Sequence, residues 1–482
     1  MFPMFLRILS GNFRAILHCP RPALIVIAAV FSLLGTAPAG ATEDFHDLIR
    51  REFEKYDPDY QIHRKQYGER LNAMAKALAE AQAQGRNLHC SQQMFIEAKW
   101  LHRYTAHWGR LEDKLKRIKQ SLDDHDQDFA TEQSPIDGFW GICYEEWFIR
   151  SSATLSALAN LAARGEQPRY RLRSKGELNT GKKLLTRLQD LLISDIANTG
   201  VNNRGELSNR ITTISQAAFK PHLRQILLEN FDLRSSASLD TLTEAFWFFL
   251  HGAQDPMTGY WGAWYIVDGK IHKSVDLSMT YHIISYTKGR VEHWPLIIAT
   301  TTAIEADPYP YGWRHKGRYN NHNIYDVAKI YKFGWPHMSE VRRSSTRKQI
   351  QSMLEWSLSN TLGPDGTFKH DPTFSDSLAD EYYFGVSFLD VVGYWQPRRR
   401  FWTDAPTDTV APALCCRLKQ TLKQLDLAGW AATGAMNKLE RNCGRNAPSD
   451  QRVVKAPLYS ARHAEQGTPG DGLSEREYQG SC

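Results

Sequence analysis

Apolar side chains recur along most of this chain at intervals of three and four residues, whereas the strict alternation of a half-buried strand is rare. This period matches one face of an α-helix. Two runs show it clearly: Leu71, Met74, Ala75, Leu78 and Ala79, and Leu184, Leu185, Leu188, Leu191 and Leu192. The pattern predicts an all-α protein. Residues 43–130 in particular are predicted to form long amphipathic helices with a charged, solvated face.

A turn that contains glycine, often beside an aromatic residue, recurs from about residue 135 onward, and a new helical run follows it. The glycines of these turns are Gly138, Gly200, Gly259, Gly312 and Gly366. Roughly 55 to 60 residues separate neighbouring turns, which leaves room for two helices and two turns per unit. One helical hairpin can bury only one face, so we expect the hairpins to stack.

One of these turns resembles the "QW" repeat of squalene cyclases and prenyltransferases. Phe249-Leu250, Gln254, Gly259 and Trp261 have its spacing, and this is the one complete copy that we recognise. The resemblance implies an α/α toroid. Neither the Asp-x-Asp-Asp motif of the cyclases nor the zinc ligands of protein prenyltransferases are evident, so terpene chemistry is not implied. We predict an incomplete ring of helical hairpins over residues 135–443, preceded by an N-terminal helical segment over residues 42–134.

Both ends of the chain differ from this middle part. Arg7, Arg14 and Arg21 precede an apolar run over residues 23–34, and Ala39-Gly40-Ala41 offers small residues for cleavage. This order predicts a signal peptide over residues 1–41, cut after Ala41, and a periplasmic or secreted protein. An uncleaved anchor is the alternative; no later segment is apolar enough to span a membrane. Residues 444–482 are polar and rich in glycine, proline and serine, so we expect a disordered tail.

The cysteines after the predicted signal peptide favour disulfides, because their number is even and the chain is predicted to be exported. Cys90 with Cys143 is the best pair, since each lies near the start of a helix in one early hairpin. Cys443 could bridge to Cys415 or to Cys416. None of these cysteines has the spacing of a metal site, and we expect neither a metal nor another cofactor.

The formal net charge of +6 is mild for 482 residues, and no block of lysines resembles a nucleic-acid-binding arm. We therefore expect neither a nucleic-acid partner nor a membrane role beyond export. A mild positive charge would suit an anionic polymer, although ordinary surface charge explains it equally well.

The densest polar stretch runs from Arg318 to Asp326 and contains Asn321, His322, Asn323 and Tyr325, just before a helical run. In a toroid the start of an inner helix faces the central funnel. The free N–H groups of a helix start favour anions. Capping is the alternative explanation, but a cap needs one asparagine only. We therefore interpret this stretch as a candidate site for a negatively charged ligand.

This stretch also resembles the Asn-Asn-His-x-x-Tyr segment of α/α-toroid alginate lyases, through Asn321-His322 and Tyr325. The resemblance implies that Asn321 and His322 neutralise a uronate carboxylate and assist proton removal. About forty residues later those lyases have an Asp-Gly turn and a helix with a catalytic tyrosine, which implies a proton-carrying role for Tyr382 or Tyr383. The arginine and the His-Tyr-His group of that helix are not matched, and alginate itself is not implied.

The chemistry explains these residue types. In β-elimination a proton α to a carboxylate is removed, and the carboxylate must first be neutralised by donors such as Asn, Arg or protonated His. A Tyr or His within hydrogen-bond reach can then act as the base, and a Tyr can protonate the leaving oxygen. Arg318 would bind substrate charge. The pair Tyr281-His282, also at a helix start, is a further candidate, with core packing as its alternative explanation.

We therefore predict an exported enzyme that cleaves an anionic, uronate-containing polysaccharide by β-elimination. The predicted catalytic residues are Asn321, His322, Tyr382 and Tyr383, and the predicted substrate-binding residues are Arg318, Asn323, Tyr325, Tyr281, His282, Trp261, Asp380 and Glu381. One alternative is a glycoside hydrolase, with Asp276 or Asp326 acting together with Asp380 or Glu381. Another is a non-catalytic polysaccharide-binding or scaffold protein that stacks sugars on Trp140, Trp261, Trp264 and Trp313. The polymer and the oligomeric state are left open.

Overall fold

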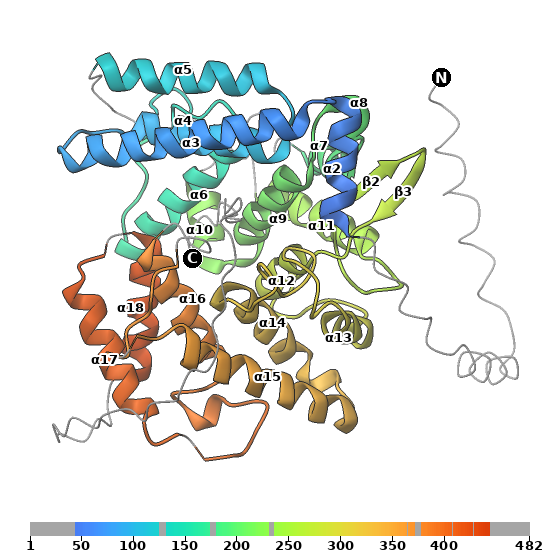
Figure 1. Ribbon diagram of the computed structural model, residues 1–482, viewed down its shortest axis with the longest axis vertical. Helices are drawn as coiled ribbons and strands as arrows, with labels where there is room; N and C mark the ends of the chain where they lie inside the picture. Colours follow the sequence, from blue (N-terminus) through green and yellow to red (C-terminus); the bar gives the residue numbers. More distant parts are fainter. Residues whose placement is uncertain are drawn as a thin grey trace, which may run out of the picture. The chain divides into compact units, whose positions relative to one another are not determined.

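The structure is a computed structural model, and it describes residues 44–124, 132–173, 180–230, 236–363, 365–371, 377–406, 408–427 and 429–443 (Figure 1). The chain divides into two units, Met1–Asp44 and Phe45–Cys482, and every helix and strand of the described residues belongs to the second. The predicted signal peptide and the predicted tail over residues 444–482 lie outside the described residues. The described part is mostly helical, as the apolar period predicts.

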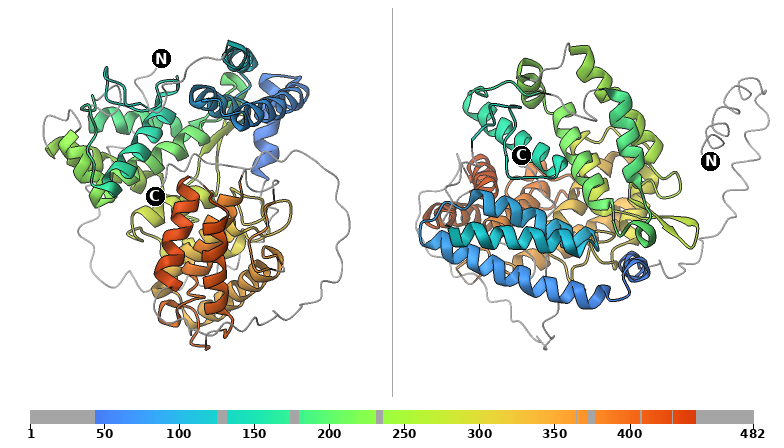
Figure 2. Two further views of the ribbon diagram at one scale, coloured as in Figure 1. Left: turned by 90° about the vertical axis from the view of Figure 1, so that its left-hand side faces the viewer. Right: turned by 90° about the horizontal axis from the view of Figure 1, so that it is seen from above.

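Three long helices near the start of the second unit form one layer, in which each contacts the other two (Figure 2). They are α3 (Tyr60–Ala83), α4 (His89–Tyr104) and α5 (Trp108–Asp124). Their shared core includes Leu71, Leu101 and Leu111. The preceding helix α2 (Phe45–Tyr56) contacts α3 and, more extensively, the short helix α8 (Ile196–Thr199), and its core partners include Tyr265 of strand β2.

Six further helices contact one another in chain order, each touching the next. They are α6 (Trp147–Arg164), α9 (Arg204–Phe219), α12 (Leu277–Tyr286), α14 (Asn321–Gly334), α16 (Leu378–Val391) and α18 (Trp430–Cys443). In α12 every residue from Leu277 to Ile284 is buried, as expected for a helix that is covered on all sides. Side chains of Asp276, Asn320 and Ser377 cap α12, α14 and α16 by accepting a backbone N–H three residues later.

The other helices lie in the chain between members of this series and pack against them or against each other. They are α7 (Gly181–Leu192), α10 (Pro221–Asn230), α11 (Ser236–Ala253), α13 (Trp294–Ala303), α15 (Glu340–Asn360) and α17 (Ala411–Gln424), with the short 3₁₀ helices η3 (Trp335–His337) and η4 (Pro397–Arg399). Helix α7 packs on α11 and α9, α10 on α6 and α9, α13 and α15 on α14, and α17 on α18. The core that joins α12 to α18 contains many aromatic side chains.

A small sheet interrupts the helices. Strand β1 (Ile193–Ser194) pairs in parallel with β2 (Trp264–Val267), and β2 pairs antiparallel with β3 (Lys270–Lys273). Asp268 and Gly269 form the hairpin turn, and both have positive φ angles, 48° and 74°. An Asp-Gly pair favours a two-residue hairpin turn, because both of its residues tolerate positive φ angles. This hairpin was not predicted from the sequence, because the surrounding apolar period is helical.

The Gln254 turn between α11 and α12 is held together by side-chain hydrogen bonds. Gln254 Nε2 donates to the carbonyl oxygens of Gly259 at 2.8 Å and Glu292 at 3.0 Å. The backbone N–H of Trp261 donates to Thr280 Oγ1 of α12 at 3.1 Å. Gly259 has a φ of 73°, and a Cβ there would lie 2.9 Å from the backbone nitrogen of Ile297. Glutamine therefore satisfies the carbonyls of a turn that only glycine can close.

A second turn, before α6, makes the same bonds. The sequence analysis included its Gly138 among the recurring turns but did not recognise Gln133 as the counterpart of Gln254. Gln133 Nε2 donates to the carbonyl oxygens of Gly138 and Tyr170, both at 2.7 Å. The N–H of Trp140 donates to Thr154 Oγ1 of α6 at 3.1 Å. Both segments read Gln-x4-Gly-x-Trp-Gly, so a search for that spacing alone would have found the second copy. We call these two segments the Gln turns.

Replacing Gln254 with alanine is expected to lower the free energy of unfolding by about 1–3 kcal/mol, because the buried carbonyl oxygen of Gly259 loses its donor and the partly buried one of Glu292 must find another. Urea unfolding followed by circular dichroism measures this. Gln133→Ala should cost a similar amount, whereas Gln351→Ala, at an exposed position of α15, should change little. An equal response of Gln254→Ala and Gln351→Ala would contradict the role given to the Gln turn.

Two disulfides join parts of the structure. Cys90 at the start of α4 bonds Cys143, with the Cα atoms 5.4 Å apart, which confirms the predicted pair. Cys415 of α17 bonds Cys443 of α18, with the Cα atoms 5.7 Å apart, so the partner of Cys443 is Cys415 and not Cys416. Both pairs fit an oxidising compartment.

Candidate functional site

Six aromatic side chains gather where α12, α14 and α16 begin. We call Tyr281, Tyr309, His322, Tyr325, Tyr383 and Phe384 the aromatic cluster. The His322 ring centroid lies 4.1 Å from that of Phe384 and 5.3 Å from that of Tyr309. Tyr325 lies 5.5 Å from Tyr281 and 6.4 Å from Phe384, and Tyr383 lies 5.1 Å from Phe384. Residues far apart in the sequence therefore share one site.

A buried carboxylate lies beside this cluster. Asp326 is fully buried, and its Oδ2 accepts a hydrogen bond from the Tyr309 hydroxyl at 3.2 Å. His322 Nε2 lies 3.9 Å from the same oxygen, because residues four apart on a helix are neighbours. The His322 side chain keeps 19 % of its surface exposed. The carboxylate can therefore orient an imidazole that water still reaches.

Burial favours the neutral form of the Tyr281 phenol. The pKa of Tyr281 is raised well above its usual value, first by burial and then by Tyr325, Asp326 and Tyr383 nearby. Lysine ammonium groups lie on the ring faces of two other phenols: Lys438 is 4.0 Å from the centroid of Tyr383, and Lys329 is 5.9 Å from that of Tyr325. A neutral phenol still carries its O–H and can therefore donate a hydrogen bond to a substrate oxygen.

Several predicted catalytic residues lie apart from the cluster. The Asn321 side chain donates to Thr361 Oγ1 at 3.1 Å and accepts from the Ser357 hydroxyl at 2.7 Å, so it ties α14 to α15. Tyr382 is fully buried and packs edge-on against Phe368, 5.3 Å between ring centroids. Burial raises the pKa of Tyr382 to about 12. Of the two tyrosines that the resemblance implied, only Tyr383 belongs to the cluster.

The predicted substrate-binding residues also divide. Tyr281 and Tyr325 belong to the cluster, whereas His282 is buried and stacks on Tyr286, 5.8 Å between centroids. Asn323 donates to the Trp313 carbonyl, and Trp261 is buried in the core. Asp380 accepts from the Ser377 hydroxyl at the α16 cap, and Glu381 accepts from the Asp371 N–H. Arg318 is exposed, and its backbone pairs with that of His315. These contacts give the five residues structural roles outside the aromatic cluster.

The residues that sequence analysis missed are Tyr309, Phe384, Lys329 and Lys438. Tyr309 lies in the loop before α14, where no period indicates which way a side chain points. Phe384 directly follows the two tyrosines that the resemblance singled out. Lys438 comes from α18, which contacts α16 only through the tertiary fold. Phe384 alone had a signal in the sequence, as a neighbour of Tyr383.

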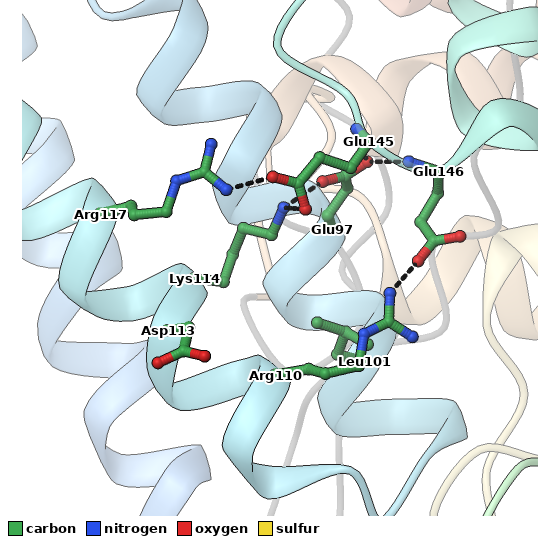
Figure 3. Close-up of a pocket in the computed structure, with 8 residues that line it drawn as sticks. All are labelled: Glu97, Leu101, Arg110, Asp113, Lys114, Arg117, Glu145 and Glu146. Atoms are coloured by element: carbon green, nitrogen blue, oxygen red, sulfur yellow. Dashed lines mark hydrogen bonds and ion pairs between the residues drawn. The ribbon is translucent and has the colours of Figure 1, made fainter.

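A second polar region is a pocket of about 210 Å³ between α4, α5 and the segment before α6 (Figure 3). Lys114 is almost fully buried there and donates to Glu97 at 2.7 Å and to Glu145 at 2.6 Å (Figure 3). Glu97 also accepts the backbone N–H groups of Glu145 and Glu146, both at 2.7 Å. These opposite charges neutralise one another, so the network cross-links the α4–α5 pair to the segment that enters α6.

Comparison with known proteins gives no relative from which a role for either region could be transferred. No protein-family model, curated protein or solved structure matches this chain. Within the described residues, no helix is long and apolar enough to cross a membrane. The same residues hold no group of three or more His, Cys, Asp or Glu side chains that could hold a metal ion.

The ion pairs of Glu145 make a small part of the stability depend on pH. Lys114 first, and then Arg117, lower the pKa of Glu145 from 4.5 to about 2. A lowered folded-state pKa contributes stability that is complete above pH 4.5 and is lost as the pH falls toward 2. Glu145 is half exposed, so we expect about 1 kcal/mol or less.

Thermal unfolding between pH 2 and pH 6 tests this expectation. The Tm difference between the parent and Glu145→Gln should be largest above pH 4.5 and should shrink toward pH 2, whereas Glu244→Gln, at an exposed position of α11, is the control. A difference for Glu145→Gln that stays constant over this range would contradict the assignment.

Proposed function

We propose that this chain is an exported α/α-toroid enzyme that cleaves a uronate-containing polysaccharide by β-elimination at the aromatic cluster. The toroid part is supported by the series α6, α9, α12, α14, α16 and α18, in which each helix contacts the next while other helices pack beside them. An incomplete ring of hairpins has this order of contacts. The two Gln turns, each placed before a helix of the series, support a repeated hairpin unit.

One observation carries the enzymatic part: a partly exposed imidazole lies beside a buried carboxylate and among the phenol rings of the aromatic cluster. His322, oriented by Asp326, would accept the proton from the carbon next to the uronate carboxylate. The electron pair of that C–H bond becomes the new C=C bond as the bond to the glycosidic oxygen breaks. A phenol of Tyr281, Tyr325 or Tyr383 would donate its proton to that leaving oxygen.

The substrate carboxylate needs neutralisation before its neighbouring proton becomes acidic enough to remove. Neutral phenols that donate hydrogen bonds, together with the charges of Lys329 and Lys438, would supply it. Compared with the roles implied by the alginate-lyase resemblance, this assignment keeps His322 and Tyr383 and replaces Asn321 and Tyr382. The resemblance remains an argument for the class of reaction only.

The contacts of two of the four candidate carboxylates argue against their use by a hydrolase. Asp276 forms a buried ion pair with Arg204, and Asp380 takes part in the cap of α16. A hydrolase needs one carboxylic acid and one carboxylate facing the same bond. The binding alternative loses two of its stacking platforms, because Trp261 and Trp313 are buried in the core.

The proposal is tested by incubating the purified protein with a panel of uronate polymers. Elimination produces an unsaturated sugar, which is followed by its ultraviolet absorbance, and reducing ends appear in equal number. Reducing ends without that absorbance would indicate hydrolysis. Binding without either signal would indicate a scaffold, and either result would overturn the proposed reaction.

A further inference from the structure

The first turn of α2 touches the loop that brings Tyr309 to the aromatic cluster. The Phe45 ring lies 5.3 Å from that of Tyr311 and 6.0 Å from that of Tyr265. The His46 ring lies 5.1 Å from that of Tyr311, and His46 Nε2 is 3.2 Å from the Tyr309 carbonyl oxygen. Two side chains of α2 therefore hold both ends of the Tyr309–Tyr311 segment.

This segment is also held from the other side. The carbonyl oxygen of Pro310 accepts the N–H of Leu277 at 2.8 Å, at the first residue of α12. Tyr311 and Tyr265 share a hydrogen bond between their hydroxyls at 3.1 Å. The loop is thus clamped between α2 and the start of α12, and α12 carries Tyr281 of the cluster.

The clamp ends at the candidate catalytic pair. The hydroxyl of Tyr309 donates to Asp326, and the Tyr309 ring packs against His322. A shift of the Tyr309 backbone would therefore displace the hydroxyl that bonds the Asp326 carboxylate and the ring that packs against the His322 imidazole. Displacements near 1 Å can lower a catalysed rate by about two orders of magnitude.

We infer that Phe45 and His46 are positioning residues: the first turn of α2 fixes Tyr309, and Tyr309 sets the geometry of Asp326 and His322. The role in rate rests on the proposed function, whereas the clamp itself does not. Helix α2 then has two roles: it packs against α8, and its first turn fixes the loop that carries Tyr309 to the aromatic cluster.

The far end of α2 offers a matched control. Tyr56 packs near His107, 6.2 Å between ring centroids, and His107 Nε2 is 3.0 Å from the Thr199 carbonyl oxygen. This is again an α2 aromatic ring beside a histidine that bonds a backbone carbonyl, but it lies at the other end of the helix. Losing it would loosen α2 without acting on Tyr309 directly.

The experiment compares three double variants of the full mature chain: Phe45→Ala with His46→Ala, the conservative Phe45→Tyr with His46→Gln, and the control Tyr56→Ala with His107→Ala. Hydrogen exchange of the peptide around residues 307–314 reports the clamp without any substrate. We expect faster exchange there in the first variant only. Equal exchange in the first variant and the parent would overturn the clamp, even if the protein is an active lyase.

The elimination assay then separates positioning from simple loss of structure. In the first variant kcat should fall on the order of tenfold with little change in KM. The conservative variant should keep most of the parent kcat. The control should keep both constants. An equal fall of kcat in the first variant and the control would overturn the positioning role, and absence of elimination by the parent would count against the proposed function alone.

Discussion

Replacing His322 with alanine is expected to lower the rate of elimination by about 10²- to 10⁴-fold, the usual contribution of a positioned general base. Its imidazole is the part of the His322–Asp326 pair that water reaches, so a substrate would meet it first. Initial rates from ultraviolet absorbance measure the effect. Folding should be little changed, since His322 is not fully buried.

Two adjacent tyrosines provide the control. Tyr383→Phe removes a hydroxyl of the aromatic cluster and should slow elimination, whereas Tyr382→Phe removes one that packs beside Phe368 and should leave the rate unchanged. Each change deletes one oxygen atom and keeps the ring. A larger rate loss for Tyr382→Phe would mean that the proton donor lies on the other face of α16.

Replacing Arg204 with methionine is expected to lower the free energy of unfolding by about 3–5 kcal/mol, because it leaves a buried carboxylate without its cation. Arg204 Nε is 2.7 Å from Asp276 Oδ2, and Nη2 is 3.2 Å from Oδ1, with both side chains almost fully buried. Asp276 also caps α12 through the N–H of Met279. Urea unfolding followed by circular dichroism measures the change.

Removing both charges at once is the informative comparison. Arg204→Met combined with Asp276→Asn keeps an acceptor for the α12 cap and should recover much of the loss. Arg164→Ala breaks an exposed pair with Glu166 and should leave the unfolding midpoint unchanged. A loss for Arg204→Met no larger than that for Arg164→Ala would contradict the account of the buried pair.

The helical class and one disulfide could be predicted because their signals are local. A period of 3.6 residues is visible within a single window, as in Leu184 and Leu188 of α7. Cys90 and Cys143 stood near helix starts of one hairpin. The hairpin at Asp268-Gly269 was equally local and was missed because its strands are only four residues long.

Some of the residues predicted for a functional site lie in the aromatic cluster, and others do not. His322, Tyr325, Tyr281 and Tyr383 meet, whereas the neighbours Asn321 and Tyr382 point elsewhere. Successive residues of a helix point about 100° apart, so the choice between two adjacent side chains depends on the rotation of the helix. Helices such as α12 and α16 are buried on several sides, and their sequences therefore do not reveal that rotation. Tyr309 lies in a loop, whose sequence shows no apolar period that would indicate where its side chain points.

The two Gln turns have a consequence for which residues the turn geometry requires. Each is closed by the same backbone pairs as well: Gly138 N–H to Ser134 at 2.8 Å and Ser134 N–H to Phe139 at 3.0 Å, matched by Gly259 to Asp255 at 2.7 Å and Asp255 to Tyr260 at 2.9 Å. Side chains as different as Ser134 and Asp255 preserve one geometry. The residues that the two segments share therefore suffice to specify this turn, and the helices that follow them can differ in sequence.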